Sequence, residues 1–562
     1  MKQVSARLIV VALASLLLVA GCAQQQGGAP NEIAFAAGAF PVDAAAECAV
    51  DEDGNPKIGL ARIEAPDEHK VIFKLCAPDP TFIEKLSVVS FGVNDSGYLV
   101  SATADESILR NPNGTGPLKL ESWSSELQSL TFSRFDGYWG TKAKSDRVVF
   151  QWQGEASARA VLLRSGVVDG IDNLYADDIP VLSADPNYLV LTRDPIATNY
   201  LGVNATIAPF DDVRVRQAVA MSIDSARLVQ NFYPVGSTEA THFVPCVIRY
   251  GCEGSDWYSV DREMAKGLLT EAGYQNGFTV PLYYRSAASL NTPDPLGIAT
   301  DVQAQLAEIG ITVELKELES TTFSTLANAG ELDGLFMGGW IADFIDPINY
   351  FYRNLVSSPE RFGGRIEAIA GPLEKAAVTE NSPERAALFA EANDAMREAA
   401  IFTPLGHGSS ALAWSSSVTG AKSSPVGFED FSPVSIPGKD AVTFVTIEEP
   451  PSLYCADEVT PNTLRYCYNI VEGLYKIESS GTKSVPNLAT SCVPSKDLTV
   501  WTCDLRQNVF FHNGARFDAG DVRDSFAAQW DCALPTHFGR TGSFDNWGFI
   551  SDFLHPEACV SE

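Results

Sequence analysis

Apolar residues recur at helical spacing in several parts of the chain, and a strand-like segment follows each of these parts. In residues 301–309 the apolar side chains stand at i, i+4 and i+7, which predicts a helix. Gly310 offers a stop, and 311–318 (ITVELKEL) then predicts a strand. Residues 261–273 and 278–285 repeat this order of helix and strand. Alternating helices and strands predict mixed α/β domains in which helices cover sheets.

Two longer helices and a C-terminal hairpin-like segment complete this pattern. Residues 211–229 predict one helix with acidic residues in its first turn, and 382–400 predict another that starts with Ser-Pro-Glu. Near the C-terminus, polar and apolar residues alternate from 504 to 511, which predicts a strand. The pair 513–514 (Asn-Gly) predicts a turn, and Asp521 is placed to cap a helix.

The N-terminus has the features of an export signal. A basic start precedes an apolar run over 8–20, which is too short to span a bilayer comfortably. Small residues stand directly before Cys22, which resembles a bacterial lipobox; the alternative is an ordinary secretory signal that contains a cysteine. We expect 1–22 to be a lipoprotein signal peptide and lipobox, Cys22 to be lipidated, and 23–33 to be a polar tether. The remaining chain is then an extracytoplasmic body anchored to the cell membrane, either periplasmic or on the cell surface.

Cysteine usage agrees with an oxidising compartment. There are 11 cysteines, and ten remain when Cys22 is set aside. Candidate disulfide pairs are Cys246 with Cys252, Cys455 with Cys467, and Cys492 with Cys503. A turn centred on residues 495–496 would place Thr499, rather than Cys503, opposite Cys492. The sequence does not pair Cys48, Cys76, Cys532 or Cys559, and the absence of a CxxC motif argues against a redox or zinc role.

Charge and motifs exclude several classes of function. The net charge of −31, from 71 acidic and 40 basic residues, argues against a nucleic-acid partner. We find no G-x-S-x-G, H-E-x-x-H or P-loop motif, so we expect no enzyme and no cofactor. The six histidines share no ligand spacing, and His512, before an Asn-Gly turn, is expected to be structural, so we expect no metal.

Seven stretches carry recognisable motifs such as EGLY, FFHNG, GTGPL, YWG, VRQAV and GGWIADFIDP. The stretches are 469–479, 485–526, 114–123, 135–140, 163–172, 199–224 and 338–351. Together they resemble the extracellular solute-binding proteins, family 5, of ABC importers, a group that includes oligopeptide-, dipeptide- and nickel-binding proteins.

The order of these stretches is rotated relative to the family. The EGLY and FFHNG pieces, which come first in the family, stand last here, and residues 437–440 join the usual end to the usual start. One explanation is a circular permutant; the other is a complete module followed by a fragment of a second copy. Residues 31–440 contain no EGLY or FFHNG piece of their own, so we favour the permutant. An assembly artefact would give the same order.

The resemblance implies a fold of the two-lobed (type II) periplasmic-binding-protein class, an α/β clamp with an extra subdomain on lobe I. Mapped onto this chain, the extra subdomain combines 34–108 with 478–562. The core of lobe I combines 109–200 with 413–477, and lobe II is 201–412. The two lobes are expected to close over a ligand by a hinge motion.

The resemblance also implies a ligand site. In peptide-binding relatives, the aspartate of a W-x-x-D-[YF] motif receives the ligand's α-amino group; here the matching residue is Asp343, with Trp340 as an apolar wall. Asp346 is expected to be either a second acidic contact or a cap before Pro347. Tyr475 and Asn204 are further candidates that could face the cleft.

The implied function is capture of a di- or oligopeptide and its delivery to the permease subunits of an ABC importer, by a monomer. Alternatives within the same fold are binding of an oligosaccharide, an opine or a nickel chelate. Alternatives outside it are a ligand-sensing lipoprotein and a secreted hydrolase.

Overall fold

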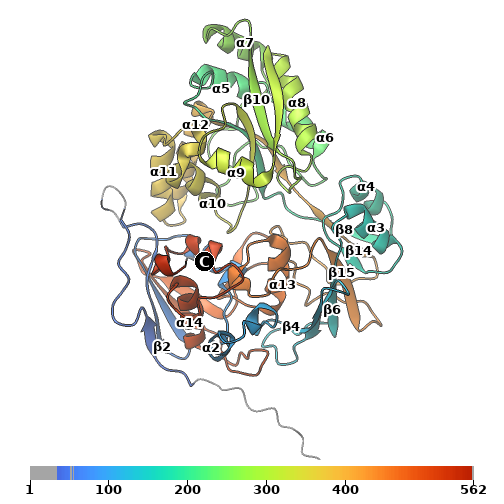
Figure 1. Cartoon of the computed structure of the whole chain (residues 1–562), viewed down its shortest axis with the longest axis vertical. Coiled ribbons are helices and arrows are strands. Elements are labelled where there is room, and N and C mark those ends of the chain that lie inside the picture. The colour runs from blue at the N-terminus through green and yellow to red at the C-terminus, as the bar shows by residue number, and fades with distance from the viewer. Residues whose placement is uncertain (1–33, 51–53, 55, 560–562) are drawn as a thin grey trace, which may run out of the picture.

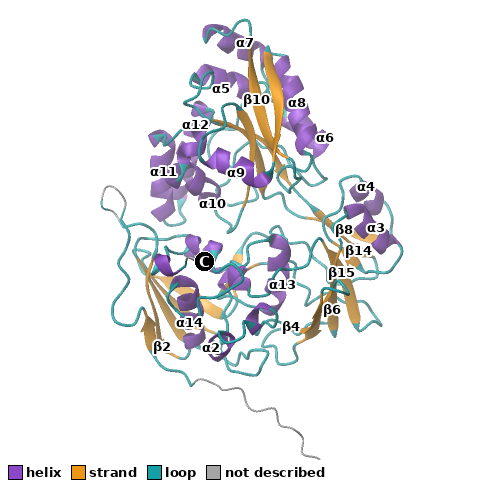
Figure 2. Ribbon diagram, viewed as in Figure 1, coloured by secondary structure: helices purple, strands orange, loops and turns teal. Residues whose placement is uncertain are grey.

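The computed structural model describes residues 34–50, 54 and 56–559. The predicted signal peptide, the lipidation site Cys22 and the tether at 23–33 lie outside the described residues. The described chain forms two lobes, and Figures 1 and 2 show helices packed around the sheets of both. We call the lower body in Figure 1 lobe I and the upper body lobe II.

Lobe II is built on a five-stranded sheet with the order β11-β10-β12-β9-β13. β10 is parallel to β11 and to β12, whereas β9 is antiparallel to its neighbours β12 and β13. The strands are β9 (Ala197–Val203), β10 (Phe278–Arg285), β11 (Ile311–Leu318), β12 (Leu335–Ile341) and β13 (Phe402–Gly408). β10 and β11 have the bounds that the sequence pattern predicts.

Lobe I contains a seven-stranded sheet with the order β4-β5-β6-β15-β7-β14-β8. β15 lies in the middle and runs parallel to β6 and β7, and the other pairs are antiparallel. The strands are β4 (Leu118–Ser124), β5 (Ser129–Arg134), β6 (Arg147–Trp152), β7 (Gly170–Ile171), β8 (Tyr188–Thr192), β14 (Ala411–Ser415) and β15 (Ala441–Thr446).

A second sheet of lobe I joins the two ends of the chain; we call it the terminal sheet. Its order is β1-β2-β3-β19-β18, and β3 pairs directly with β19 in antiparallel register. The strands are β1 (Gly38–Phe40), β2 (Leu60–Asp67), β3 (Lys70–Leu75), β18 (Ala489–Pro494) and β19 (Val500–Leu505). Blue and red segments therefore lie together in Figure 1. The described C-terminal part of the chain, up to residue 559, is part of lobe I, while the exact domain limits given above remain predictions.

Helices cover the faces of these sheets. Those of the first half are α1 (Phe82–Leu86), α2 (Ser96–Ala102), α3 (Ala156–Arg164), α4 (Asp178–Ser183), α5 (Val213–Ala220), α6 (Ser225–Phe232) and α7 (Arg262–Glu271). Those of the second half are α8 (Pro295–Ala307), α9 (Ser320–Asn328), α10 (Pro347–Tyr352), α11 (Glu367–Val378), α12 (Pro383–Ala399), α13 (Pro461–Ile470) and α14 (Ala519–Trp530). A small hairpin of β16 (Tyr475–Ile477) and β17 (Ser484–Pro486) and short helical turns complete the described chain.

Three of the predicted local features differ in the structure. The strand expected over 504–511 ends at Leu505 with β19, and the chain bends at residues 507–508. The single helix expected over 211–229 is two helices, α5 and α6, because Asp224 starts a new helix by accepting a hydrogen bond from the amide of Arg227. The cap of α14 is Asp518 rather than Asp521, which is its partner in a capping box.

The chain crosses between the lobes twice, at residues 193–196 and 409–410. The first crossing joins β8 of lobe I to β9 of lobe II, and the second joins β13 to β14. The two crossings are bonded to each other. The Arg193 amide donates to Ser410 O at 2.8 Å, and Ser409 Oγ donates to Arg193 O at 2.6 Å.

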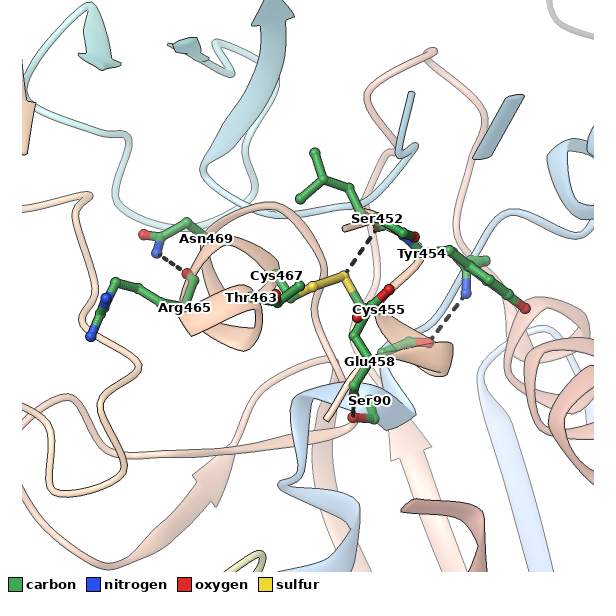
Figure 3. The surroundings of a disulfide bond; sticks show 12 residues. Ser90, Ser452, Tyr454, Cys455, Glu458, Thr463, Arg465, Cys467 and Asn469 are labelled. Atoms are coloured by element: carbon green, nitrogen blue, oxygen red, sulfur yellow. Dashed lines mark hydrogen bonds between the residues drawn. A yellow bond between two sulfur atoms is a disulfide. The ribbon is translucent and has the colours of Figure 1, made fainter. Parts of the chain in front are cut away.

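The ten cysteines other than Cys22 form five disulfides. Three are pairs that the sequence suggested: Cys246–Cys252, Cys455–Cys467 and Cys492–Cys503. The other two are Cys48–Cys76 and Cys532–Cys559. Figure 3 shows the Cys455–Cys467 bond between a helical turn (Cys455–Asp457) and α13.

The hairpin of β18 and β19 has a longer turn than the one centred on 495–496, and this is why Cys492 faces Cys503. Asp497 closes the turn by accepting hydrogen bonds from Ser495 Oγ and from the amide and hydroxyl of Thr499.

In the part of the chain that the structure describes, no helix has the length and apolar character needed to cross a membrane.

Four buried charges hold the base of the first crossing in lobe I. Arg193 contacts Asp172 and Glu429, both at 2.7 Å, and Arg465 of α13 contacts the same two carboxylates at 2.6 and 2.7 Å. All four side chains are buried. Burial alone would raise the pKa of Asp172, but Arg193 and Arg465 hold it well below its ordinary value. We call these four residues the charge quartet.

The charge quartet predicts a large effect of one substitution. Arg465→Met leaves two buried carboxylates with a single guanidinium, so we expect the free energy of unfolding to fall by about 3–5 kcal/mol. Urea unfolding at neutral pH measures this. The matched control is Arg164→Met, which removes a more exposed ion pair with Asp178 and should cost less than about 1 kcal/mol. Equal effects of the two substitutions would contradict the assigned role of the quartet.

Candidate functional site

A pocket of about 440 Å³ opens in lobe II at the carboxyl ends of its parallel strands. Its wall residues stand at the ends of three strands. Arg285 ends β10 and residues between 287 and 291 follow it, Ser320 and Ser324 follow β11, and residues between 339 and 343 end β12 and continue beyond it. Parallel strands leave such a crevice at their carboxyl edge, where ligands of α/β proteins commonly bind. The pocket therefore brings together Trp340 and Asp343, the two site residues that the sequence ranked first.

Asp343 is held by one residue of the neighbouring helix α10. Asn349 Oδ1 accepts a hydrogen bond from the Asp343 amide at 3.0 Å, and Asn349 Nδ2 donates to Asp343 Oδ2 at 3.2 Å. Burial raises the pKa of Asp343, against the opposing effects of Asn349 and of the Arg353 charge. A carboxylate that has lost much of its hydration and keeps one oxygen available is suited to receive a cationic group.

Trp340 is fixed by the same asparagine. Its Nε1 donates to Asn349 Oδ1 at 2.9 Å, so Asn349 sets the positions of both Trp340 and Asp343. The floor beside Trp340 requires a glycine, because a Cβ at Gly339 would lie 1.6 Å from Asn291 Nδ2. The pocket thus has a rigid aromatic wall and a polar floor.

Arg285 supplies a positive charge in the same pocket, which the sequence analysis did not identify. Its guanidinium lies 4.7 Å from the centre of the Phe323 ring, and its NH2 donates weakly to Ser324 Oγ at 3.3 Å. Among the described residues, no carboxylate pairs with it. Burial lowers the pKa of Arg285, as expected of a guanidinium without a counter-ion. The position could have been found from sequence, because Arg285 is the last residue of a strand that the pattern predicts.

Asp346 is a structural residue in this structure. Its two oxygens accept hydrogen bonds from the NH1 and NH2 groups of Arg385 at 2.7 and 2.9 Å, and both residues are buried. Asp346 also caps α10 through the amide of Ile348. Of the two roles that the sequence left open, a second ligand contact or a cap, the structure shows the cap.

Asn204 and Tyr475 do not line this pocket. The amide group of Asn204 is used in a turn, where its Oδ1 accepts from Thr206 and its Nδ2 donates to Gly330 O at 2.9 Å. Tyr475 lines a separate pocket of about 330 Å³ in lobe I, together with Tyr138, Trp139 and Glu472. The Tyr475 hydroxyl accepts a hydrogen bond from the Cys492 amide at 3.0 Å.

His512 makes hydrogen bonds within the protein through both ring nitrogens. Nδ1 accepts from the Gly114 amide at 3.3 Å, and Nε2 lies 3.0 Å from Gly116 O. Burial lowers the pKa of His512 to about 4. Two groups elsewhere in the described chain place a histidine near two cysteines, but both pairs of cysteines are disulfide-bonded and offer no thiolate.

Comparison with known proteins gives a family match over much of the chain. The model of the bacterial extracellular solute-binding proteins, family 5 Middle, matches residues 30–361 and 483–541. Heme-binding protein A of Haemophilus influenzae is 29% identical over 392 residues, which cover 68% of this chain and 70% of the relative. The dipeptide-binding protein of Escherichia coli is 26% identical over 392 residues, which cover 68% and 72%.

Solved structures of similar proteins have the same kind of fold. HbpA2 from Haemophilus parasuis matches with a TM-score of 0.62 at 26% identity, over 67% of this chain and 76% of that one. DppA from Helicobacter pylori, a periplasmic binding protein in complex with the peptide STSA, matches with a TM-score of 0.53 at 26% identity, over 67% and 74%. These neighbours support the two-lobed α/β architecture predicted from the sequence.

The different roles of the two aspartates predict different costs of replacing them. Asp346→Asn breaks a buried ion pair and leaves Arg385 uncompensated, so we expect the free energy of unfolding to fall by about 3–5 kcal/mol. Asp343→Asn removes a charge that burial already disfavours, so we expect a change within about 1 kcal/mol. Denaturant unfolding of the two variants checks this order. A larger loss for Asp343→Asn would show that Asp343 is the structural residue.

Proposed function

The chain belongs to the bacterial extracellular solute-binding proteins of family 5, and we propose that it captures a di- or oligopeptide between its two lobes for an ABC importer. One observation carries this proposal: Asp343 and Arg285 stand in the same pocket, and neither has an ion-pair partner among the described residues. A peptide has an α-ammonium group and an α-carboxylate group. The first is complementary in charge to Asp343 and the second to Arg285, so both ends of a peptide could form charge-assisted hydrogen bonds in this pocket.

The apolar lining of the pocket agrees with such a ligand. Trp340 and Ile341 line the pocket beside the two charged groups. Side chains of differing size can pack on these surfaces, while the charged ends of the ligand set its orientation. Relatives that carry the names dipeptide-binding protein and di/tripeptide-binding protein support a peptide over other solutes.

The remaining parts of the proposal follow from the family. Its members are extracytoplasmic solute-binding proteins, which supports delivery of the ligand to a membrane permease rather than chemical conversion of it. We propose that Cys22 carries a lipid anchor and that the chain acts as a monomer. Haem is the second candidate ligand, because one relative at 29% identity is named for binding it.

We also propose that the chain is a circular permutant of the family order. Two findings support this. β19 pairs with β3 within one sheet, so the C-terminal segment completes lobe I rather than starting a second module. In addition, the family model matches two stretches that are separated by 362–482, as expected where the two parts of a rotated chain are matched separately.

The peptide proposal predicts the effects of changes on both partners. The dipeptide alanyl-alanine should bind the soluble chain in isothermal titration calorimetry. Asp343→Asn and Arg285→Met should each weaken binding by about 10- to 150-fold, the equivalent of about 1.5–3 kcal/mol. An N-acetylated dipeptide should bind the wild type more weakly than the free dipeptide does, whereas Asp343→Asn should bind the two ligands with similar affinity. A dipeptide with a C-terminal amide should likewise bind the wild type more weakly than the free dipeptide, whereas Arg285→Met should bind these two ligands with similar affinity.

The matched control is Asp136→Asn, which alters an exposed aspartate of lobe I and should leave affinity unchanged. Haem is titrated in parallel. If haem binds, dipeptides do not, and Asp343→Asn has no effect, the peptide proposal is wrong.

The permutation proposal predicts that the chain still folds when its segments are placed in the order found in the family. A gene encoding residues 438–562 followed by 23–437 opens the chain in an exposed loop and joins the present ends. We expect the same disulfides and a free energy of unfolding within about 2 kcal/mol of the original, because no described helix or strand is cut. A control that opens the chain in the middle of α12 should not fold. If the reordered chain also fails to fold, the permutation proposal fails.

A further inference from the structure

The residue after Asp343 reaches from lobe II into lobe I. Phe344 is 4% exposed and belongs to the apolar cluster that packs on the terminal sheet. Its ring centre lies 5.6 Å from that of Phe549 in an edge-to-face arrangement, and Lys85 Nζ of α1 lies 5.7 Å from it. These are the distances of an aromatic pair and a cation–π contact. A side chain of one lobe is therefore buried in the core of the other.

Phe344 is also tightly connected to the ligand pocket. It directly follows Asp343, and its carbonyl accepts a hydrogen bond from the Asp346 amide at 3.0 Å. Asp346 is fixed in turn by Arg385 of α12. Because this short loop is held at both ends, Phe344 cannot leave lobe I without moving Asp343 and lobe II with it. Separation of the lobes would expose the ring to water, which disfavours the open state by roughly tenfold to a hundredfold.

A carboxyl group of lobe I faces the same contact. Glu84 of α1 lies close enough to Asp346 and Arg385 of lobe II for their charges to affect its pKa. Asp79 of lobe I is the other carboxylate that affects the pKa of Glu84, and it forms an ion pair with Lys85 at 2.6 Å. Among the described residues, Glu84 Oε2 is buried without a hydrogen-bond partner. An ionised carboxylate in this position would be both poorly solvated and next to Asp346, so the contact favours the protonated acid.

We propose that Phe344 and Glu84 form a latch between the lobes, in which Phe344 positions Asp343 by seating in lobe I and Glu84 takes up a proton as the latch closes. The contact between Phe344 and lobe I is present in the structure and does not depend on which ligand the protein binds. Its link to ligand capture rests on the proposed function of the Asp343 pocket.

The direction of the pH effect follows from the two states of Glu84. Burial, and then the Asp346 charge, raise the pKa of Glu84 to about 7 in this arrangement, while Arg385 acts in the opposite direction. In separated lobes Asp346 and Arg385 move away and water returns, so the pKa falls toward its ordinary value of 4.5. Closure is therefore favoured as pH falls from about 7 to about 4.5, by at most tenfold for each pH unit. Above and below this window Glu84 contributes no pH dependence.

Small-angle X-ray scattering of the soluble chain, without ligand, between pH 5 and pH 8 tests the latch. The radius of gyration of the wild type should increase with pH as the lobes open. Glu84→Gln, which is neutral at every pH, should stay compact at pH 8. Phe344→Ala should be extended even at pH 5, and Phe344→Leu should recover part of the compact state. Glu126→Gln changes an exposed carboxyl group of lobe I and should follow the wild type.

Two results would overturn the proposal. The first is that Glu84→Gln has the same radius of gyration as the wild type at pH 8. The second is that Phe344→Leu and Phe344→Ala have the same radius of gyration as the wild type at pH 5. If Phe344→Ala does not fold, the Leu and Gln variants still decide the question. A parallel titration with alanyl-alanine should show tighter binding at pH 5.5 than at pH 7.5 in the wild type, and a weaker pH dependence in Glu84→Gln. If the lobes respond to pH as expected but no dipeptide binds, the peptide function fails while the latch stands.

Discussion

The two lobes depend on a hinge whose base is fixed by buried charges. Arg193 begins the first crossing, and its backbone is bonded to both residues of the second crossing. Its side chain enters the charge quartet with Asp172, Glu429 and Arg465. Buried ion pairs contribute less to net stability than to a unique arrangement of their elements, since breaking one leaves an unpaired charge. The quartet therefore anchors Arg193 in lobe I, and the bonds of Arg193 to Ser409 and Ser410 fix the second crossing beside it.

The same principle operates at the pocket of lobe II, with a different outcome. Asp346 and Arg385 form a fully paired, buried unit that holds the loop after β12. Asp343, three residues earlier, accepts one hydrogen bond from Asn349 Nδ2 and donates one from its amide to Asn349 Oδ1, and its carboxylate has no ion-pair partner among the described residues. Two aspartates in one short motif thus stand in different environments: Asp346 is neutralised by Arg385, whereas Asp343 has no ion-pair partner among the described residues.

Much of the architecture could be predicted from the sequence, but only part of the pocket. The bounds of β10 and β11 followed from residue patterns, because strand and helix periodicity is local information. The sequence analysis did not predict the break between α5 and α6, because Asp224 acts as a helix cap only when the amide of Arg227 lies within hydrogen-bonding distance. Trp340 and Asp343, which were predicted from a short motif, line the same pocket. Arg285 could have been noticed as the last residue of a predicted strand, but its place beside Trp340 and Asp343 depends on the pairing of β10 with β12, which no local pattern encodes.

The terminal sheet has a consequence for how this chain is made. Asn94 and Ser525 share hydrogen bonds across 431 residues of sequence, and β3 has no partner on one side until β19 has emerged. The first three strands can pair with one another, but the other edge of β3 stays free until nearly the whole chain has been made. Such edges are prone to aggregate, and contacts between distant residues form slowly. Nascent chains of this protein would therefore need help from chaperones for longer than chains in which the first strands find neighbours early.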